Sequence, residues 1–421
     1  MRVHLTAPAA AAVRRGHPWV YRDGIADGGG HGSKRGEGKR GERGEGKRGE
    51  RAHRGGAAAS GDVVELSAEG APFLGRGLWD ADSAIAVRVF QRTQAPPLDE
   101  RAIAERLERA FALRDGWFDG RDTTAYRLCN GEGDRVPSLV IDRYDRAAVI
   151  RLDGDMLAPW LDRLLPHLAR ALGARGVRSI GLRARASAAG EDADGKKLAH
   201  LHGPPLPDRL FVRETGIAME VDLARGQKTG AFLDQRDNRA RVRALAAGRR
   251  RVLNLFSYAG GFSVAAALGG AGRVTSVDSA SAAHASAQRT FRENGVDPAA
   301  HEFVTADAFD FLEKARARGD RYDLIICDPP SFAPSERAKP RALGAYRRLH
   351  AAVARVLDRG GVLCAASCSS HITAEDFLAT LDDATLERDD LRIRAIHGQP
   401  EDHPTLPAWW EGRYLKFVVL E

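Results

Sequence analysis

A turn of small residues between a strand and a helix is the first segment of this chain that could bind a charged ligand. It reads Asn254-Leu-Phe-Ser-Tyr-Ala-Gly-Gly-Phe-Ser263. Small residues let the backbone approach a ligand closely, and the start of the next helix offers unpaired N–H donors. We predict that Phe256, Ser257, Gly260 and Gly261 contact a nucleotide-like cofactor. Because the spacing is not Gly-x-Gly-x-x-Gly, the turn alone is weak support.

Three acidic residues follow the next predicted strands. Asp278 comes about 18 residues after the glycines, where a carboxylate can accept hydrogen bonds from ribose hydroxyls. Asp307 follows the third strand, at a place suited to contact an adenine amino group, and Asp328 follows the fourth. Pro329 and Pro330 fix the backbone after Asp328 and hold its carboxylate rigidly, and we predict that Asp328 and Pro329 also contact the cofactor. Taken singly, each acid could instead cap a helix.

Alternating strands and helices after residue 211 would bring these segments to one edge of a sheet. The alternation predicts a mostly parallel sheet with crossover helices. The predicted strands are 251–256, 273–277, 302–305, 323–327 and 361–366, the helices are about 262–269, 280–294, 307–318 and 340–359, and the tail 391–421 supplies two further strands. With the four features in this order, the segment resembles the class I S-adenosylmethionine-dependent methyltransferase fold. A dinucleotide dehydrogenase would explain the loop and first acid, but it does not require Asp328-Pro-Pro-Ser-Phe332.

The N-terminal part has a different pattern. Short runs of alternating apolar residues at 62–66, 73–78 and 85–90 predict a small β-barrel-like domain. A linker at 94–98 leads to a helix with apolar positions Ile103, Leu107, Ala110 and Phe111, and 155–172 reads as another helix. We therefore predict an N-terminal domain over 1–95, a small α+β middle domain over 96–208 and an α/β domain over 209–421.

A low-complexity insertion interrupts the N-terminal domain at 27–60. Its octad Arg35-Gly-Glu-Gly-Lys-Arg-Gly-Glu42 is repeated directly as 43–50. The segment has too few apolar residues to offset the entropy of ordering, so we predict disorder. It supplies four of the seven net positive charges, so the basic composition is compatible with RNA binding but does not establish it. The insertion is either a weak electrostatic tether for RNA or a neutral expansion of a loop.

The composition argues against several other classes of protein. No run approaches the ~20 apolar residues of a membrane helix, and the start lacks a signal-peptide pattern. The four cysteines show no C-x-x-C spacing, which predicts reduced thiols and no metal site. We expect a cytoplasmic protein without a membrane partner.

Several further motifs narrow the resemblance. They are Gly226-Gln-Lys-Thr-Gly-Ala-Phe-Leu-Asp-Gln-Arg236, Ser257-Tyr-Ala-Gly-Gly-Phe262, Asp328-Pro-Pro-Ser-Phe332, Ser367-Cys-Ser369, Asp402-His-Pro-Thr-Leu406 and Glu411-Gly-Arg-Tyr-Leu-Lys416. Together they resemble the bacterial 23S ribosomal RNA cytosine-5 methyltransferase family. Arg15-Gly-His-Pro-Trp-Val20 looks like the opening of that family's N-terminal PUA domain, a small RNA-binding barrel, and 131–142 looks like its middle domain. The resemblance covers nearly all of the chain except 27–60.

The resemblance implies S-adenosylmethionine as cofactor and a covalent mechanism. Cytosine C5 is a poor nucleophile, and a thiolate that adds to C6 converts the ring to an enamine whose C5 can attack a methyl group. Cys368 matches the family's nucleophile motif, although a buried, merely structural cysteine is the alternative. Asp328 would stabilise charge at N3. The base that removes the C5 proton is not identified, because Ser331 stands where many RNA cytosine-5 methyltransferases carry a second cysteine.

RNA is the implied substrate, as 23S ribosomal RNA or its large-subunit precursor. We predict substrate contacts for Arg15, Trp19, Asp234, Arg236, Pro330 and Phe332. Arg236 could equally be an ion-pair partner within the fold. His371 is either a proton shuttle or a helix cap, and His403 either stabilises a turn or takes part in catalysis. A homodimer is a candidate assembly.

Two other functions stay open at the level of the sequence. An RNA methyltransferase of the same fold could act on a base nitrogen, such as one of guanine, and Cys368 would then be incidental. A non-enzymatic RNA-binding protein is disfavoured, because the glycines, the acids and Asp328-Pro-Pro330 are all present.

Overall fold

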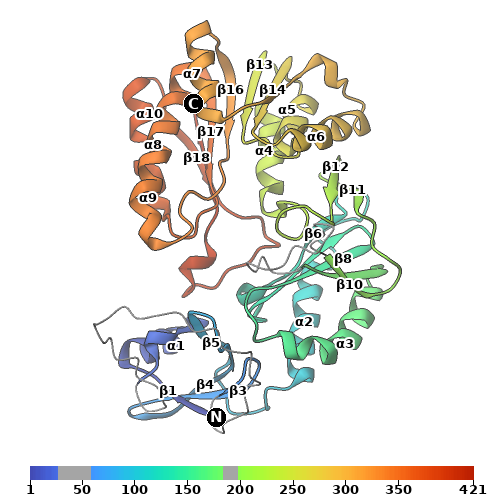
Figure 1. The fold of residues 1–421 in the computed structure, drawn as a ribbon, viewed down its shortest axis with the longest axis vertical. Helices are drawn as coiled ribbons and strands as arrows, with labels where there is room; N and C mark the ends of the chain where they lie inside the picture. Colours follow the sequence, from blue (N-terminus) through green and yellow to red (C-terminus); the bar gives the residue numbers. More distant parts are fainter. Residues whose placement is uncertain (27–57, 184–197) are drawn as a thin grey trace, which may run out of the picture. The chain divides into compact units, whose positions relative to one another are not determined.

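The computed structural model describes residues 1–26, 58–183 and 198–421 (Figure 1). They form two compact units, residues 1–103 with 154–164 and residues 104–153 with 165–421. The insertion predicted to be disordered spans 27–60, and residues 27–57 of it lie outside the described residues. The predicted boundary at 208 falls within the second unit, and the division into three domains remains a prediction.

A five-stranded sheet is the framework of the first unit. Its order is β1-β3-β4-β5-β2, and Val13, Val20, Val64 and Leu66 are fully buried beside it. The elements are β1 (Arg2–His4), α1 (Ala7–Arg15), β2 (Trp19–Tyr21), β3 (Val63–Ala68), β4 (Ala71–Trp79) and β5 (Ile85–Gln91). The three alternating runs predicted as strands are therefore β3, β4 and β5.

A second five-stranded sheet, of order β10-β9-β8-β7-β6, opens the second unit. Its strands are β6 (Ala125–Asn130), β7 (Leu139–Tyr144), β8 (Ala147–Leu152), β9 (Ser179–Arg183) and β10 (Leu198–His202). Helix α2 (Glu100–Arg114) buries its four predicted apolar positions. Helix α3 (Leu161–Gly173) begins at Leu161 rather than Asp155, and a short 3₁₀ helix, Ala158–Trp160, directly precedes it.

A seven-stranded sheet forms the rest of the second unit, in the order β15-β14-β13-β16-β17-β19-β18. The first five strands are parallel, and β19 runs antiparallel to both β17 and β18. The strands are β13 (Arg251–Leu255), β14 (Arg273–Asp278), β15 (Glu302–Thr305), β16 (Tyr322–Cys327), β17 (Leu357–Ser367), β18 (Ile393–His397) and β19 (Lys416–Leu420). All seven strands were predicted from the sequence. The hairpin β11 (Arg209–Glu214) and β12 (Ile217–Asp222) precedes this sheet.

Helices cover both faces of the seven-stranded sheet (Figure 1). Alternate strand residues enter two separate cores, so Ile325 and Leu363 pack on one face while Leu324 and Val362 pack on the other. The helices are α4 (Arg236–Leu245), α5 (Gly261–Leu268), α6 (Ser281–Glu293), α7 (Ala308–Arg318), α8 (Lys339–Val356), α9 (Ala374–Ala379) and α10 (Asp382–Glu387). Helices α5 to α8 match the predicted ranges closely. The architecture is the predicted class I methyltransferase fold.

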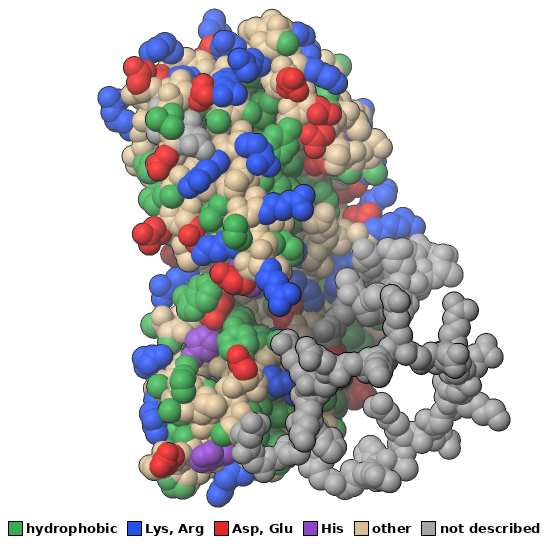
Figure 2. Space-filling view, turned by 60° about the vertical axis from the view of Figure 1, so that its left-hand side comes forward, with side chains coloured by type: hydrophobic (Ala, Val, Ile, Leu, Met, Phe, Trp, Pro, Cys, Tyr) green, Lys and Arg blue, Asp and Glu red, His purple; other side chains and the backbone are tan. Residues whose placement is uncertain are grey.

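Charged side chains of both signs lie on the surface of the protein (Figure 2). No helix in the described ranges is long and apolar enough to span a membrane. On the face shown in Figure 2, Lys and Arg side chains are interspersed with acidic ones and do not gather into one basic patch. All four cysteines are free thiols, as predicted.

Candidate functional site

Asp328 and Cys368 leave neighbouring parallel strands at the same edge of the sheet. Strands β16 and β17 pair in parallel up to Cys327 and Ala365, so the two residues follow the carboxyl ends of adjacent strands. Asp328 is half-buried, and its Oδ2 accepts a hydrogen bond from Gln235 Nε2 at 2.9 Å. Burial and the negative charge of Asp234 raise the pKa of Asp328 to about 7. Near neutral pH this carboxyl can therefore donate a proton as well as accept one.

Cys368 is the only one of the four cysteines that is not fully buried. Burial and the adjacent Asp328 raise the pKa of its thiol to about 11, while the positive charge of Lys228 opposes that rise. Cys327 and Cys364 are fully buried and pack into the two cores of the sheet. Of the four cysteines, only Cys368 can therefore act as a nucleophile. Its thiol needs a neighbouring group that stabilises the thiolate.

The loop that carries Cys368 is fixed by a buried lysine. Lys416, at the start of β19, donates from Nζ to the carbonyl oxygens of Ser369 (2.6 Å), Ile372 (2.7 Å) and Tyr414 (2.8 Å). Burial lowers the pKa of Lys416 to about 8. Since all three protons of its ammonium are occupied by carbonyls, Lys416 acts as a clamp on the loop.

The glycine-containing turn has left-handed backbone at three positions. Phe256 and Tyr258 have φ values of 58° and 46°, and Gly260 has φ 77°. A Cβ on Gly260 would lie 2.6 Å from Cβ of Ala287, so a side chain does not fit there. Ser257 Oγ is buried without a hydrogen-bond partner among the described residues, which leaves it available to a ligand.

The two predicted nucleoside acids contact backbone amides. Asp278 accepts hydrogen bonds from the N–H groups of Tyr258 (2.8 Å) and Ala280 (2.9 Å), and it thereby ties β14 to the glycine turn. Asp307 caps α7 by accepting from Phe309 N at 2.8 Å and Asp310 N at 3.2 Å. The capping alternative therefore holds for Asp307. Capping uses only its Oδ1, so it does not preclude a ligand contact through Oδ2.

Asp234 lies at the centre of a charged cluster beside Asp328. Lys228 Nζ contacts its Oδ2 at 2.6 Å, and the hydroxyl of Tyr414 donates to the same oxygen at 2.7 Å. These cationic and hydroxyl partners hold the pKa of Asp234 well below its usual range although the side chain is buried. The next residue, Gln235, bonds Asp328, so the cluster and the candidate acid are linked through consecutive residues.

Arg236 is an internal ion-pair partner, the second of its two predicted alternatives. Its Nη1 and Nη2 contact the Asp402 carboxylate at 2.9 and 3.0 Å, and both side chains are buried. Asp402 also accepts from the backbone N–H of Arg127 in β6 at 2.8 Å. The guanidinium is therefore not available for the predicted contact with RNA. His403 bonds Asp402 at 3.1 Å within the same buried group, which favours the structural alternative for this histidine.

The other predicted substrate residues are placed as follows. Pro330 is exposed, and Phe332 is half-buried with its ring centroid 4.9 Å from that of Tyr346. Pro329, a predicted cofactor residue, is buried. In the first unit Arg15 is exposed and Trp19 is half-buried under the Arg88 guanidinium. His371 does not cap the next helix, because Thr373 does so. Sequence reasoning missed Lys228, Gln235, Tyr414 and Lys416 as individuals, although each lies within a motif that it singled out.

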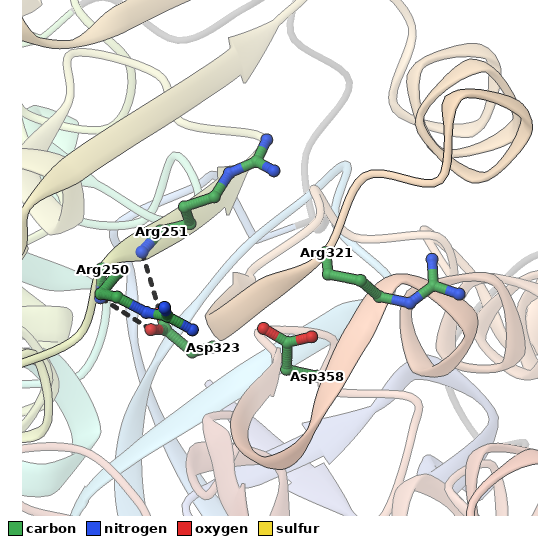
Figure 3. A pocket seen from close by; sticks show the side chains of 5 residues that line it. All are labelled: Arg250, Arg251, Arg321, Asp323 and Asp358. Carbon is green, nitrogen blue, oxygen red and sulfur yellow. Dashed lines mark hydrogen bonds between the residues drawn. The ribbon is translucent and has the colours of Figure 1, made fainter.

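A cavity at the opposite edge of the sheet offers a weaker site. It encloses about 300 Å³ among Arg250, Arg251, Arg321, Asp323 and Asp358, at the amino ends of β13, β16 and β17 (Figure 3). The backbone N–H groups of Arg250 and Arg251 donate to the Asp323 carboxylate at 2.7 and 3.0 Å. Open α/β sheets bind ligands at the carboxyl ends of their strands, so this cavity lies at the wrong edge.

Comparison with known proteins adds independent findings. Residues 180–409 match the model of an S-adenosylmethionine-dependent methyltransferase family, and residues 3–92 match that of a PUA-like domain. A ribosomal RNA large subunit methyltransferase of Deinococcus radiodurans is 36% identical, over 100% of this chain and 97% of its own. A ribosomal RNA large subunit methyltransferase I of Shewanella denitrificans is 31% identical, over 100% and 98%. A solved structure from Streptococcus mutans, described as a SAM-dependent methyltransferase, has the same fold with a TM-score of 0.82 at 24% identity, over 100% and 99%.

Proposed function

The chain belongs to the S-adenosylmethionine-dependent methyltransferase family and carries a PUA-like domain, and on that premise we propose that it methylates cytosine C5 in large-subunit ribosomal RNA. The choice of RNA is supported by the names of the relatives that cover the whole chain. The choice of cytosine C5 is supported by one observation. The only cysteine that is not fully buried lies next to a carboxyl of raised pKa, at the carboxyl edge of the sheet.

The residues around the glycine turn fit the cofactor. Gly260 and Gly261 form the start of α5, whose first backbone N–H groups have no partner within the helix. The orphaned Ser257 Oγ is a free polar group, and Asp278 and Asp307 follow the two strands beside it. We assign the ribose to Asp278 and the adenine amino group to Oδ2 of Asp307, with Phe256 and Pro329 lining the site. When bound, the cofactor supplies an electrophilic methyl group on a sulfonium.

The side chains at the edge can carry the remaining steps. The Cys368 thiolate adds to C6 of cytosine, and the neutral carboxyl of Asp328 gives its proton to N3, so the ring becomes an enamine without a full negative charge. C5 of this enamine would be the nucleophile toward the methyl group of a bound cofactor. Loss of the C5 proton to water, with return of the N3 proton to the Asp328 carboxylate, would restore the C5–C6 double bond and expel the thiolate. Pro330 and Phe332 follow Asp328 closely in the chain and would contact the base. Arg15 and Trp19 are assigned to RNA contacts of the PUA-like unit.

A fluorine at C5 tests this chemistry directly. The enzyme is incubated with labelled S-adenosylmethionine and large-subunit RNA fragments that contain either cytidine or 5-fluorocytidine. With cytidine we expect label in 5-methylcytosine. With 5-fluorocytidine we expect a covalent protein–RNA adduct at Cys368, because C5 then has no proton to lose. Label in another nucleoside without any adduct would contradict the proposal.

The high pKa of the Cys368 thiol also suits a second candidate. A thiol that is mostly protonated at neutral pH is compatible with methylation of a base nitrogen, in which Asp328 would hydrogen-bond the base and no covalent step occurs. The same experiment separates the two reactions, since a nitrogen methyltransferase labels a different nucleoside and forms no adduct.

Asp328→Asn should change the pH dependence as well as the rate. In the wild type the thiolate fraction rises with pH up to about 11, while the neutral fraction of Asp328 falls above about 7. The two trends cancel above pH 7, so kcat/KM should level off there. The variant cannot titrate at this position, so we expect kcat/KM about 10²-fold lower at pH 7 and still rising above it. A variant profile that levels off like the wild type would contradict the acid role of Asp328.

A further inference from the structure

Lys228 is held in an unusual backbone conformation by its loop. Its φ is 53°, a left-handed value that residues other than glycine rarely adopt. The following residue, Thr229, is fully buried and bonds both Asp142 at 2.5 Å and the Tyr144 hydroxyl at 2.8 Å. The loop is therefore anchored to β7, at the end of which Tyr144 lies. This anchoring fixes the direction in which the Lys228 side chain leaves the loop.

The ammonium of Lys228 is oriented by three neighbours. Asp234 Oδ2 lies 2.6 Å from its Nζ, and the rings of Phe232 and Tyr414 lie with their centroids 4.6 and 5.8 Å from Nζ. About a quarter of the side chain is exposed, in contrast to the fully buried Asp234. In this ion pair the Asp234 carboxylate lies inside the protein, and the Lys228 ammonium remains accessible to solvent.

Four charged groups and one neutral phenol influence the ionisation of Cys368, each from a different part of the fold. Asp328 after β16 and Asp234 before α4 are negative, and both disfavour the thiolate. Lys228 and Lys416 are positive and favour it, while Tyr346 of α8 is a neutral phenol nearby. Lys416 directs its protons at three carbonyls, as described above. Lys228 is tied to the Cys368 loop through Tyr414. The Lys228 ammonium lies over the Tyr414 ring, and Lys416 Nζ bonds both the Tyr414 carbonyl and that of Ser369, the residue after Cys368.

We propose that Lys228 is a positioning residue whose ammonium, oriented by Asp234, stabilises the Cys368 thiolate, with the thiol proton passing to solvent. The inference rests on the proposed function, because it gives Cys368 a reason to ionise. It also gives the Gly226–Gly230 segment and Asp234 a role in the reaction that does not require direct contact with RNA.

Alkylation of Cys368 by iodoacetamide measures this effect without RNA or cofactor. Only the thiolate reacts, forming a thioether and releasing iodide, and the other three cysteines are fully buried. Rates are followed on the full chain between pH 7 and 10 by mass spectrometry of the Cys368 peptide. For Lys228→Gln we expect the profile to move up by about one pH unit, so that alkylation at pH 8 is about tenfold slower. Lys228→Arg should restore most of the rate.

An exposed lysine supplies the matched control. Lys314→Gln removes a lysine of α7 that is exposed and should leave the profile unchanged. An unchanged profile in Lys228→Gln, or an equal shift in Lys314→Gln, would overturn the proposal. Methylation that survives in Cys368→Ala would instead overturn the proposed function while leaving the effect of Lys228 on the thiol intact.

Discussion

Cys368→Ala should lower methyl transfer to RNA by at least about 10³-fold, because the covalent route to an activated C5 is lost with the nucleophile. Binding of the cofactor should be unaffected, since the residues assigned to it lie in the glycine turn and after β14 and β15. We would measure incorporation of labelled methyl groups under single-turnover conditions, together with cofactor affinity by calorimetry. Loss of turnover with retained affinity is the expected combination.

Cys364→Ala is the matched control for this variant. Cys364 is fully buried in the core beside Val362 and Phe417, three residues before the end of the same strand. Its replacement should lower stability modestly and leave the rate within a few-fold of the wild type. If Cys368→Ala were as active as Cys364→Ala, the covalent mechanism would be wrong and only the methyltransferase assignment would remain.

The sheet and its ligand-binding edge could be predicted from the sequence because their signals are local. Alternation of strands with helices fixes the order of the elements, and the edge of a parallel sheet where ligands bind follows from that order. Asp328 and Cys368 come directly after strands, so their proximity follows from the pairing of β16 with β17.

The buried polar network could not be predicted, because its members are far apart in the chain. Asp402 meets Arg127 and Arg236, which lie 275 and 166 residues away, and no local pattern indicates such pairs. The two alternatives for Arg236, an RNA contact and an ion pair within the fold, stayed open for this reason, because its charge is compatible with both and its partner was unknown. Lys228 and Lys416 likewise lie within motifs that the sequence analysis identified. Their functions could not be predicted, because they depend on which groups the fold places around them.

Asp402→Ala should lower the free energy of unfolding of the second unit by about 3–5 kcal/mol, because it removes the buried carboxylate that pairs with Arg236 and leaves the guanidinium only the more exposed Asp237, 3.3 Å from its Nε. In the wild type, Asp402 accepts two hydrogen bonds from Arg236 and one from the Arg127 backbone, and it is fully buried. Urea unfolding followed by circular dichroism would measure the loss. Methyl transfer should fall too, since Arg236 immediately follows Asp234 and Gln235, which contact Lys228 and Asp328.

Asp389→Ala is the control that separates burial from charge. Asp389 pairs with Arg359 at 3.7 Å, and both side chains are largely exposed, at 87% and 79%. An exposed pair contributes at most about 1 kcal/mol, because water and salt screen it. If both variants lost equally little stability, the pair between Asp402 and Arg236 would be dispensable. The Lys228 cluster would then have to be held by its own loop and rings alone, and methyl transfer in Asp402→Ala should stay close to that of the wild type.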